Sequence, residues 1–110
     1  MIPQDKWIWH GFGGHASVRD SCSYRLCTEV GNMVISTIGA YMIDGVEEDI
    51  CHGHRYETVV FEIIDRCSVP GCGCGKPVHN GSEIERNAYH TAGEARKGHM
   101  DMCLKWAKIC

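Results

Sequence analysis

Apolar and polar residues alternate with a period of two over residues 22–42, and Gly31-Asn32 lies midway along this segment. Glycine at the first position of a two-residue loop favours a type II′ turn, so the pattern predicts a β-hairpin. Pairing Val30 with Met33 sets the register, because each step along one arm is matched by a step along the other. The further predicted pairs are Thr28 with Ile35, Leu26 with Thr37, Tyr24 with Gly39, and Cys22 with Tyr41.

Residues 56–64 are the most strand-like segment of the chain, because they are rich in β-branched and aromatic residues. With the hairpin they predict an antiparallel sheet of three strands, or of four if Lys6–His10 joins it. The intervening residues 43–55 are largely polar and predict a connection, with one helical turn at Val46–Ile50.

The pattern changes after residue 64. Residues 65–81 are rich in glycine and proline and predict a loop. Two capping boxes then predict a short helix at 83–90 and a longer helix at 92–108. Gly98 weakens the longer helix by roughly 1 kcal/mol relative to alanine, so a close packing contact is expected there. The capping boxes pair Ser82 with Glu85 and Thr91 with Glu94.

Length and charge restrict the class of protein. A chain of 110 residues is expected to form one domain, here with a β-rich part over 1–64 and a Cys-rich loop plus helices over 65–110. The formal net charge is −3 and the basic residues are scattered, whereas nucleic-acid-binding proteins usually carry a basic stripe. No apolar run approaches the roughly 18–20 residues of a membrane-spanning helix. Neither nucleic acid nor a membrane is therefore the expected partner.

Eight cysteines are many for a chain of this length. The segment Met1–Trp7 has no basic region followed by an apolar stretch, so no secretory signal is expected and a reducing cytoplasm is favoured. In such a compartment, clustered cysteine and histidine indicate a metal site more often than disulfides. A disulfide framework and buried unpaired thiols are the alternatives.

Five potential zinc ligands fall within residues 67–103. His99 and Cys103 are four residues apart on the predicted helix and therefore share one of its faces. Zn²⁺ prefers four thiolate or imidazole ligands, so this pair and two of three loop cysteines would complete one closed, structural site. The alternative is that His99 and Cys103 are part of the buried stripe of an amphipathic helix. The favoured loop cysteines are Cys67 and Cys72, with Cys74 close behind.

Cys51, His52 and His54 form a second cluster of potential metal ligands. Ligands so close in sequence have strained geometry, and no fourth partner is obvious in the sequence, although His10, His15 or Cys22 could supply one in space. A solvated loop is therefore the favoured interpretation of this segment.

A catalytic site can also be assembled from residues far apart in the chain. A histidine near the N-terminus, a Ser-Thr on a mid-chain strand and a glutamate on a later strand follow the order found in transferases similar to ADP-ribosyltransferases. The full motifs are missing, so a transferase or hydrolase is the alternative function rather than the preferred one. Its candidate residues are His15, Thr37 and Glu57, with Ser36 as a substitute for Thr37.

Several short motifs lie between residues 7 and 64: Trp7-x-Trp9, Gly14-His15, Ser36-Thr37-Ile38-Gly39-x-Tyr41 and Tyr56-Glu57-Thr58-x-Val60-Phe61. They resemble a group of small, uncharacterised proteins of tailed bacteriophages and prophages. The resemblance implies expression in a bacterial cytoplasm and action by binding a host component, and it carries over no catalytic residue. Ala40 stands where an acidic residue would be expected in this group, which counts against an enzyme.

Together these features predict an α+β fold with a small antiparallel sheet, a loop stapled by zinc through cysteine and histidine, and a C-terminal helix. The preferred function is that of a phage-type accessory or inhibitor protein that binds a host protein in the bacterial cytoplasm. One structural zinc ion is the only cofactor predicted. The partner's identity and the oligomeric state are left open.

Overall fold

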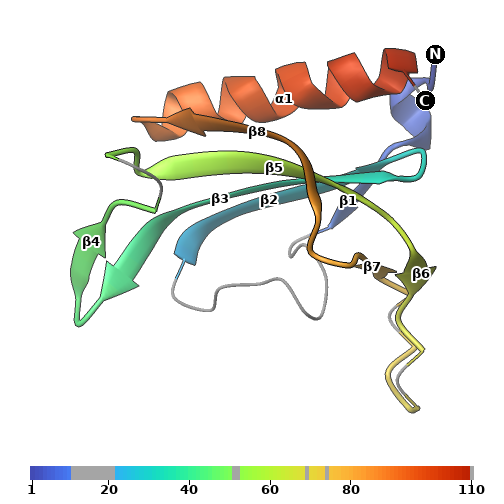
Figure 1. Cartoon of the computed structure of the whole chain (residues 1–110), viewed down its shortest axis with the longest axis horizontal. Coiled ribbons are helices and arrows are strands. Elements are labelled where there is room, and N and C mark those ends of the chain that lie inside the picture. The colour runs from blue at the N-terminus through green and yellow to red at the C-terminus, as the bar shows by residue number, and fades with distance from the viewer. Residues whose placement is uncertain (11–21, 51–52, 69, 74, 110) are drawn as a thin grey trace.

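The computed structural model of the chain describes residues 1–10, 22–50, 53–68, 70–73 and 75–109. Its elements are η1 (Gln4–Lys6), β1 (Ile8–His10), β2 (Cys22–Val30), β3 (Met33–Ile43), β4 (Val46–Glu48), β5 (Tyr56–Glu62), β6 (Asp65–Arg66), β7 (Pro77–Val78), β8 (Glu83–Tyr89) and α1 (Ala92–Ile109). Six strands form one sheet in the order β1-β2-β3-β5-β8, with β4 paired to β3, while β6 and β7 pair with each other. Figure 1 shows α1 running alongside this sheet, with the β6–β7 hairpin projecting away from the helix. The predicted α+β class, with an antiparallel sheet and a C-terminal helix, is confirmed.

The central hairpin forms as predicted. Gly31 has a φ of 61°, which a type II′ turn requires at its first central position. The register of β2 and β3 is confirmed at every predicted pair, from Val30–Met33 to Cys22–Tyr41. β5 pairs with the other side of β3, and β1 adds an outer strand to β2.

The segment 83–90 was predicted to be a helix, and this prediction is wrong, because β8 is a strand paired with β5. Ser82 does not cap a helix, since its N–H donates to Asn80 Oδ1 at 2.9 Å. The side of β5 that β3 leaves open accepts the segment, and this tertiary pairing overrides the local preference of its Glu, Arg and Ala residues for helix.

The predicted helical turn at Val46–Ile50 is also wrong, because β4 occupies residues 46–48. Asp44 and Gly45 have φ values of 51° and 79°, so they form a two-residue turn with positive φ at both positions. This is the type I′ geometry that Asp-Gly favours between paired strands. With β4 and β8, the sheet has six strands instead of three or four.

The long helix α1 is predicted correctly to within a residue. Its capping box is reciprocal: Thr91 N–H donates to Glu94 Oε1 at 3.1 Å, and Glu94 N–H donates to Thr91 Oγ1 at 3.1 Å. Among the described residues, no helix is long and apolar enough to cross a membrane. The buried stripe of α1 consists of Ala95, His99, Met102, Cys103 and Ala107.

The core lies between this stripe and one face of the sheet. Thr28, Ile35 and Val60 stand side by side on β2, β3 and β5 and are fully buried there. The N-terminal segment joins the same core, because Ile2 N–H donates to Ala107 O at 2.7 Å and Trp7 packs into the cluster. The β-rich part and the C-terminal part therefore share one core.

Candidate functional site

His99 lies at the centre of the interface between α1 and the sheet, where it is completely buried. Its Nδ1 is 2.7 Å from Thr37 Oγ1, and its Nε2 is 2.8 Å from Thr28 Oγ1. Burial lowers the pKa of His99 to about 4, so the ring is neutral at physiological pH. A neutral imidazole has one donor and one acceptor nitrogen, and the two hydroxyls satisfy both. His99 therefore forms part of a closed hydrogen-bond network.

The β6–β7 hairpin, which carries Cys67 and Cys72, is attached to the other face of the sheet. Glu29 follows the helix-facing Thr28, so its side chain points away from α1, and Arg66 of β6 forms an ion pair with it. On the same face, the ring of His79, just after β7, stacks on Phe61 at 3.8 Å between centroids. These two contacts place the hairpin opposite α1, in agreement with Figure 1.

The structure therefore does not bring the two halves of the predicted zinc site together. Cys67 and Cys72 belong to the hairpin, His99 and Cys103 belong to the core beneath α1, and Cys74 lies outside the described residues. Within the described part of the chain, no group of three or more His, Cys, Asp or Glu side chains is arranged to hold a metal ion. His99 lies in the buried stripe of α1, with both ring nitrogens hydrogen-bonded to threonines.

Of the candidate catalytic residues, Thr37 lies on the helix-facing side of the sheet, whereas its substitute Ser36 shares the opposite face with Glu57. Thr37 pairs with Thr58 and is hydrogen-bonded to it beneath α1. Glu57 is the next residue along β5, so its side chain points to the opposite face. The structure does not bring Thr37 and Glu57 together, and His15 lies outside the described residues.

The second predicted metal cluster is described only in part. Cys51 and His52 lie outside the described residues. The ring of His54 stacks on that of His90 with 4.3 Å between centroids. This contact ties the start of β5 to the connection between β8 and α1.

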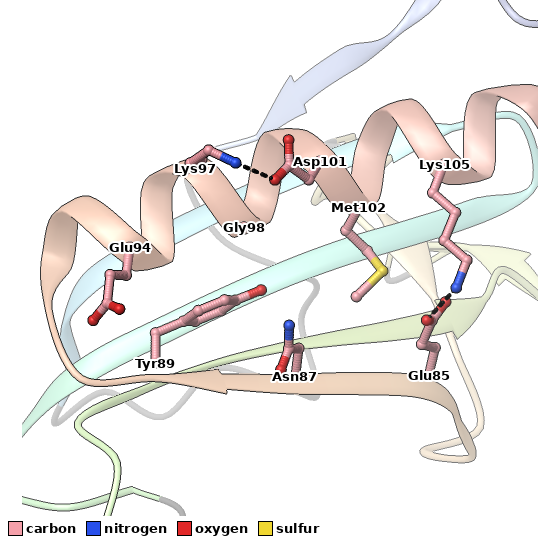
Figure 2. A pocket seen from close by; sticks show the side chains of 9 residues that line it. All are labelled: Glu85, Asn87, Tyr89, Glu94, Lys97, Gly98, Asp101, Met102 and Lys105. Carbon is pink, nitrogen blue, oxygen red and sulfur yellow. Dashed lines mark hydrogen bonds and ion pairs between the residues drawn. The ribbon is translucent and has the colours of Figure 1, made fainter.

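A pocket of about 410 Å³ lies between β8 and α1 (Figure 2). Every second residue of β8 points toward the helix, as strand geometry requires, and this places three polar side chains in the pocket wall. The helix contributes the opposite wall along successive turns. The lining residues are Glu85, Asn87 and Tyr89 from β8, and Glu94, Lys97, Gly98, Asp101, Met102 and Lys105 from α1.

Tyr89 is the deepest polar residue of this pocket and is only 9% exposed. Its hydroxyl is buried and has no hydrogen-bond partner among the described residues. A Cβ at position 98 would lie 2.2 Å from the Tyr89 hydroxyl, so the ring fits only because residue 98 is glycine. The close contact expected at Gly98 is thus confirmed, although the sequence did not indicate Tyr89 as its partner.

The charges at the rim of the pocket are largely paired. Lys97 Nζ lies 2.9 Å from Asp101 Oδ2, and Lys105 forms an ion pair with Glu85. Glu94 carries a further carboxylate, which accepts the capping hydrogen bond from Thr91. The lining thus holds three carboxylates and two ammonium groups, and both ammonium groups already have an anionic neighbour.

β8 is also an edge strand, and the described residues contain no strand that pairs with its outer side. In an antiparallel ladder, successive residues bond alternately to one neighbour and to the other. Ala40 N–H donates to Arg55 O, and this hydrogen bond continues the β3–β5 ladder. The backbone groups of the odd-numbered residues of β5 therefore bond to β3. The even-numbered residues bond to Asn87 and Tyr89, so the backbone groups of Arg86 and the carbonyl of Ala88 face outward. The Ala88 N–H donates to Asn87 Oδ1 at 3.0 Å.

A second pocket, of about 360 Å³, lies on the other side of α1. Trp9 of β1, which is 52% exposed, forms its outer wall, and the ring of His99 lies 6.2 Å from the Trp9 ring. The remaining lining residues are Leu26, Arg96 and Met100. Its lining includes the fully buried His99, whose nitrogens are both hydrogen-bonded.

Comparison of the chain with protein-family models, with curated proteins and with solved structures finds no match in any of the three. The function must therefore be argued from the geometry of the sheet edge and of the pockets.

Proposed function

We propose that the protein acts by binding another protein, and that it takes up an extended segment of that partner along the outer edge of β8. The observation that carries this proposal is the position of β8, a seven-residue strand at the end of the sheet with a polar pocket beside it. In strand addition, main-chain hydrogen bonds provide affinity and pockets for alternate side chains provide specificity. An edge strand and an adjoining pocket supply both requirements.

The character of the partner follows from charge and from the resemblance to phage proteins. Both lysines of the pocket are paired with carboxylates, and the chain has a net charge of −3, so a polyanion is not favoured. The resemblance supports a host protein in the bacterial cytoplasm as the partner. On this proposal the protein is a phage-type accessory or inhibitor protein.

Affinity capture from a bacterial lysate tests the proposal if the wild type is compared with two variants of one residue. Ala88→Pro places its ring where an added strand would pair with residue 88, while an edge strand tolerates proline at such a position. It also removes the N–H that donates to Asn87 Oδ1. Ala88→Ser keeps the N–H and is the matched control. We expect a captured protein that Ala88→Ser retains and Ala88→Pro loses, with unchanged circular dichroism for both variants. Equal capture by the two folded variants would exclude the β8 edge as the binding site.

The structural zinc stays a prediction, and we propose Cys67, Cys72 and Cys74, which lie close together in the sequence, as three of its ligands. His99 and Cys103 are omitted, because they lie beneath α1 on the opposite side of the sheet. Elemental analysis of the purified full chain should give about one zinc per chain. A Cys67→Ser, Cys72→Ser double variant should lose the metal, whereas His99→Gln should keep it. A metal-free, folded wild type would contradict this proposal.

A further inference from the structure

Two polar groups of β8 face the pocket without a partner among the described residues. The first is the buried Tyr89 hydroxyl. The second is Asn87 Nδ2: the Ala88 N–H donates to Asn87 Oδ1 at 3.0 Å, which fixes the orientation of the amide. Figure 2 shows the amide nitrogen of Asn87 pointing toward α1, on the side where the Tyr89 hydroxyl lies. The pocket therefore presents two neighbouring hydrogen-bond donors.

Two neighbouring donors require an acceptor from the ligand. The charges at the rim of the pocket determine whether a charged or a neutral acceptor is favoured. The three carboxylates outnumber the two ammonium groups, and Glu94 has no cation beside it among the described ion pairs. A ligand carboxylate would thus enter a site of negative charge, which disfavours it. A carboxamide supplies the acceptor oxygen without a charge, and its NH₂ group can donate to the carboxylates.

The flexible wall of the pocket allows entry to the buried hydroxyl. Figure 2 shows the Met102 side chain extending from α1 into the pocket that Tyr89 also lines. Methionine is unbranched and adapts its conformation readily, so its thioether can make room for a ligand group. A ligand that pairs the hydroxyl removes the penalty of an unsatisfied buried donor, and this gain is specific to a hydrogen-bonding ligand.

From this geometry we infer that the β8–α1 pocket binds a carboxamide side chain, that of glutamine or asparagine, on the segment that pairs with β8. Tyr89 and Asn87 donate to its oxygen, and the acidic rim accepts from its nitrogen. The inference rests on the proposed function for the origin of the segment. The binding of the side chain itself can be tested without the partner.

The test is a titration of the ¹⁵N-labelled full chain, followed by two-dimensional NMR, with N-acetyl-glutamine N′-methylamide. The equivalent capped glutamate and capped methionine are the comparison probes. We expect capped glutamine to shift the side-chain NH₂ resonance of Asn87 in a saturable way, with at least about fivefold weaker binding of capped glutamate. The side-chain NH₂ of Asn80 is the internal control, because this residue lies in the turn before β8. Absence of a saturable shift, or tighter binding of capped glutamate, would overturn the inference.

Two variants separate this inference from the proposed function. Tyr89→Phe keeps the ring and removes the hydroxyl, so it should weaken capped-glutamine binding by about fivefold or more. It should also weaken capture of the partner that Ala88→Pro abolishes. If Ala88→Pro abolishes capture and Tyr89→Phe changes neither measurement, the edge is the binding site and the carboxamide pocket is rejected. If capped glutamine binds through Tyr89 while Ala88→Pro leaves capture intact, the pocket is confirmed and strand addition is rejected.

Discussion

The two pockets that flank α1 differ in how their buried polar groups are satisfied. On the β1 side, His99 is fully buried and both nitrogens are hydrogen-bonded to threonines. On the β8 side, Tyr89 is nearly as buried, and its hydroxyl has no partner among the described residues. A satisfied network makes a core rigid and specific, whereas an unsatisfied group costs stability unless a ligand completes it. The polar groups of the β1-side pocket thus stabilise the fold, and the β8-side pocket is the better candidate for ligand binding.

The largest effect should come from removing His99. His99→Ala deletes a buried ring and removes one hydrogen bond from each of the hydroxyls of Thr28 and Thr37, so it should lower the free energy of unfolding by about 3–5 kcal/mol. Lys108→Ala, at an exposed position of the last helical turn, is the control and should change it by less than about 0.5 kcal/mol. Urea unfolding measures both. A loss below about 1 kcal/mol for His99→Ala would mean that the network does not organise the core.

The protonation of His99 should make stability depend on pH. In the unfolded chain the ring takes up a proton near its ordinary pKa of 6.5, whereas burial lowers the pKa of folded His99 to about 4. Between these values the unfolded state binds more protons, so the free energy of unfolding falls as the pH drops from about 6.5 to about 4. The loss should reach roughly 3 kcal/mol at most.

Urea unfolding at pH 7.5 and pH 4.5 measures this loss, and His99→Gln is the matched variant. Glutamine can bond to both threonines and does not titrate. Burial also lowers the pKa of His79, and the hydrogen bond from Arg66 lowers the pKa of Glu29. These two groups contribute equally to the pH dependence of the wild type and of His99→Gln. The difference between the wild type and His99→Gln isolates His99. Parallel pH profiles would contradict the assignment.

Substituting alanine for Gly98 tests the close packing of the Tyr89 ring against α1. A Cβ there would lie 2.2 Å from the Tyr89 ring, so Gly98→Ala should lower the free energy of unfolding by about 1–3 kcal/mol despite alanine's higher helix propensity. Gly93, in the same helix, meets nothing nearer than Thr91 Oγ1 at 4.0 Å. Gly93→Ala should therefore stabilise the protein by up to about 1 kcal/mol. Equal effects of the two substitutions in thermal unfolding would show that Tyr89 is not confined by Gly98.

Features encoded by neighbouring residues could be predicted from the sequence. The Gly31-Asn32 turn and the alternation of its flanking residues determine the register of β2 and β3, so all five pairs could be predicted. The capping box at Thr91 is equally local, and it placed the start of α1 correctly. In each case the residues that determine the local structure lie within a few positions of one another.

Features that depend on distant contacts could not be predicted. The residues of β8 include good helix formers, and they become a strand because β5 offers an open side. Spacing correctly placed His99 and Cys103 on one helix face. It could not separate a metal ligand from a hydrogen-bonded core residue, because Thr28 and Thr37 lie 71 and 62 positions from His99. The pocket at Tyr89 was missed for the same reason, since it exists only once β8 lies beside α1.

The smallest effect on stability should come from Tyr89→Phe, and it is the most direct test of the difference between the two pockets. The substitution removes a hydroxyl that has no partner among the described residues, so the free energy of unfolding should stay unchanged or rise by up to about 1 kcal/mol. Thr28→Val removes a hydroxyl that is paired with His99 and should cost about 1–2 kcal/mol. If urea unfolding gave equal losses for both, the Tyr89 hydroxyl would be held by a hydrogen bond, and the two pockets would not differ. If Tyr89→Phe leaves stability unchanged or raises it and still weakens capture of the partner, the Tyr89 hydroxyl serves binding at the expense of stability.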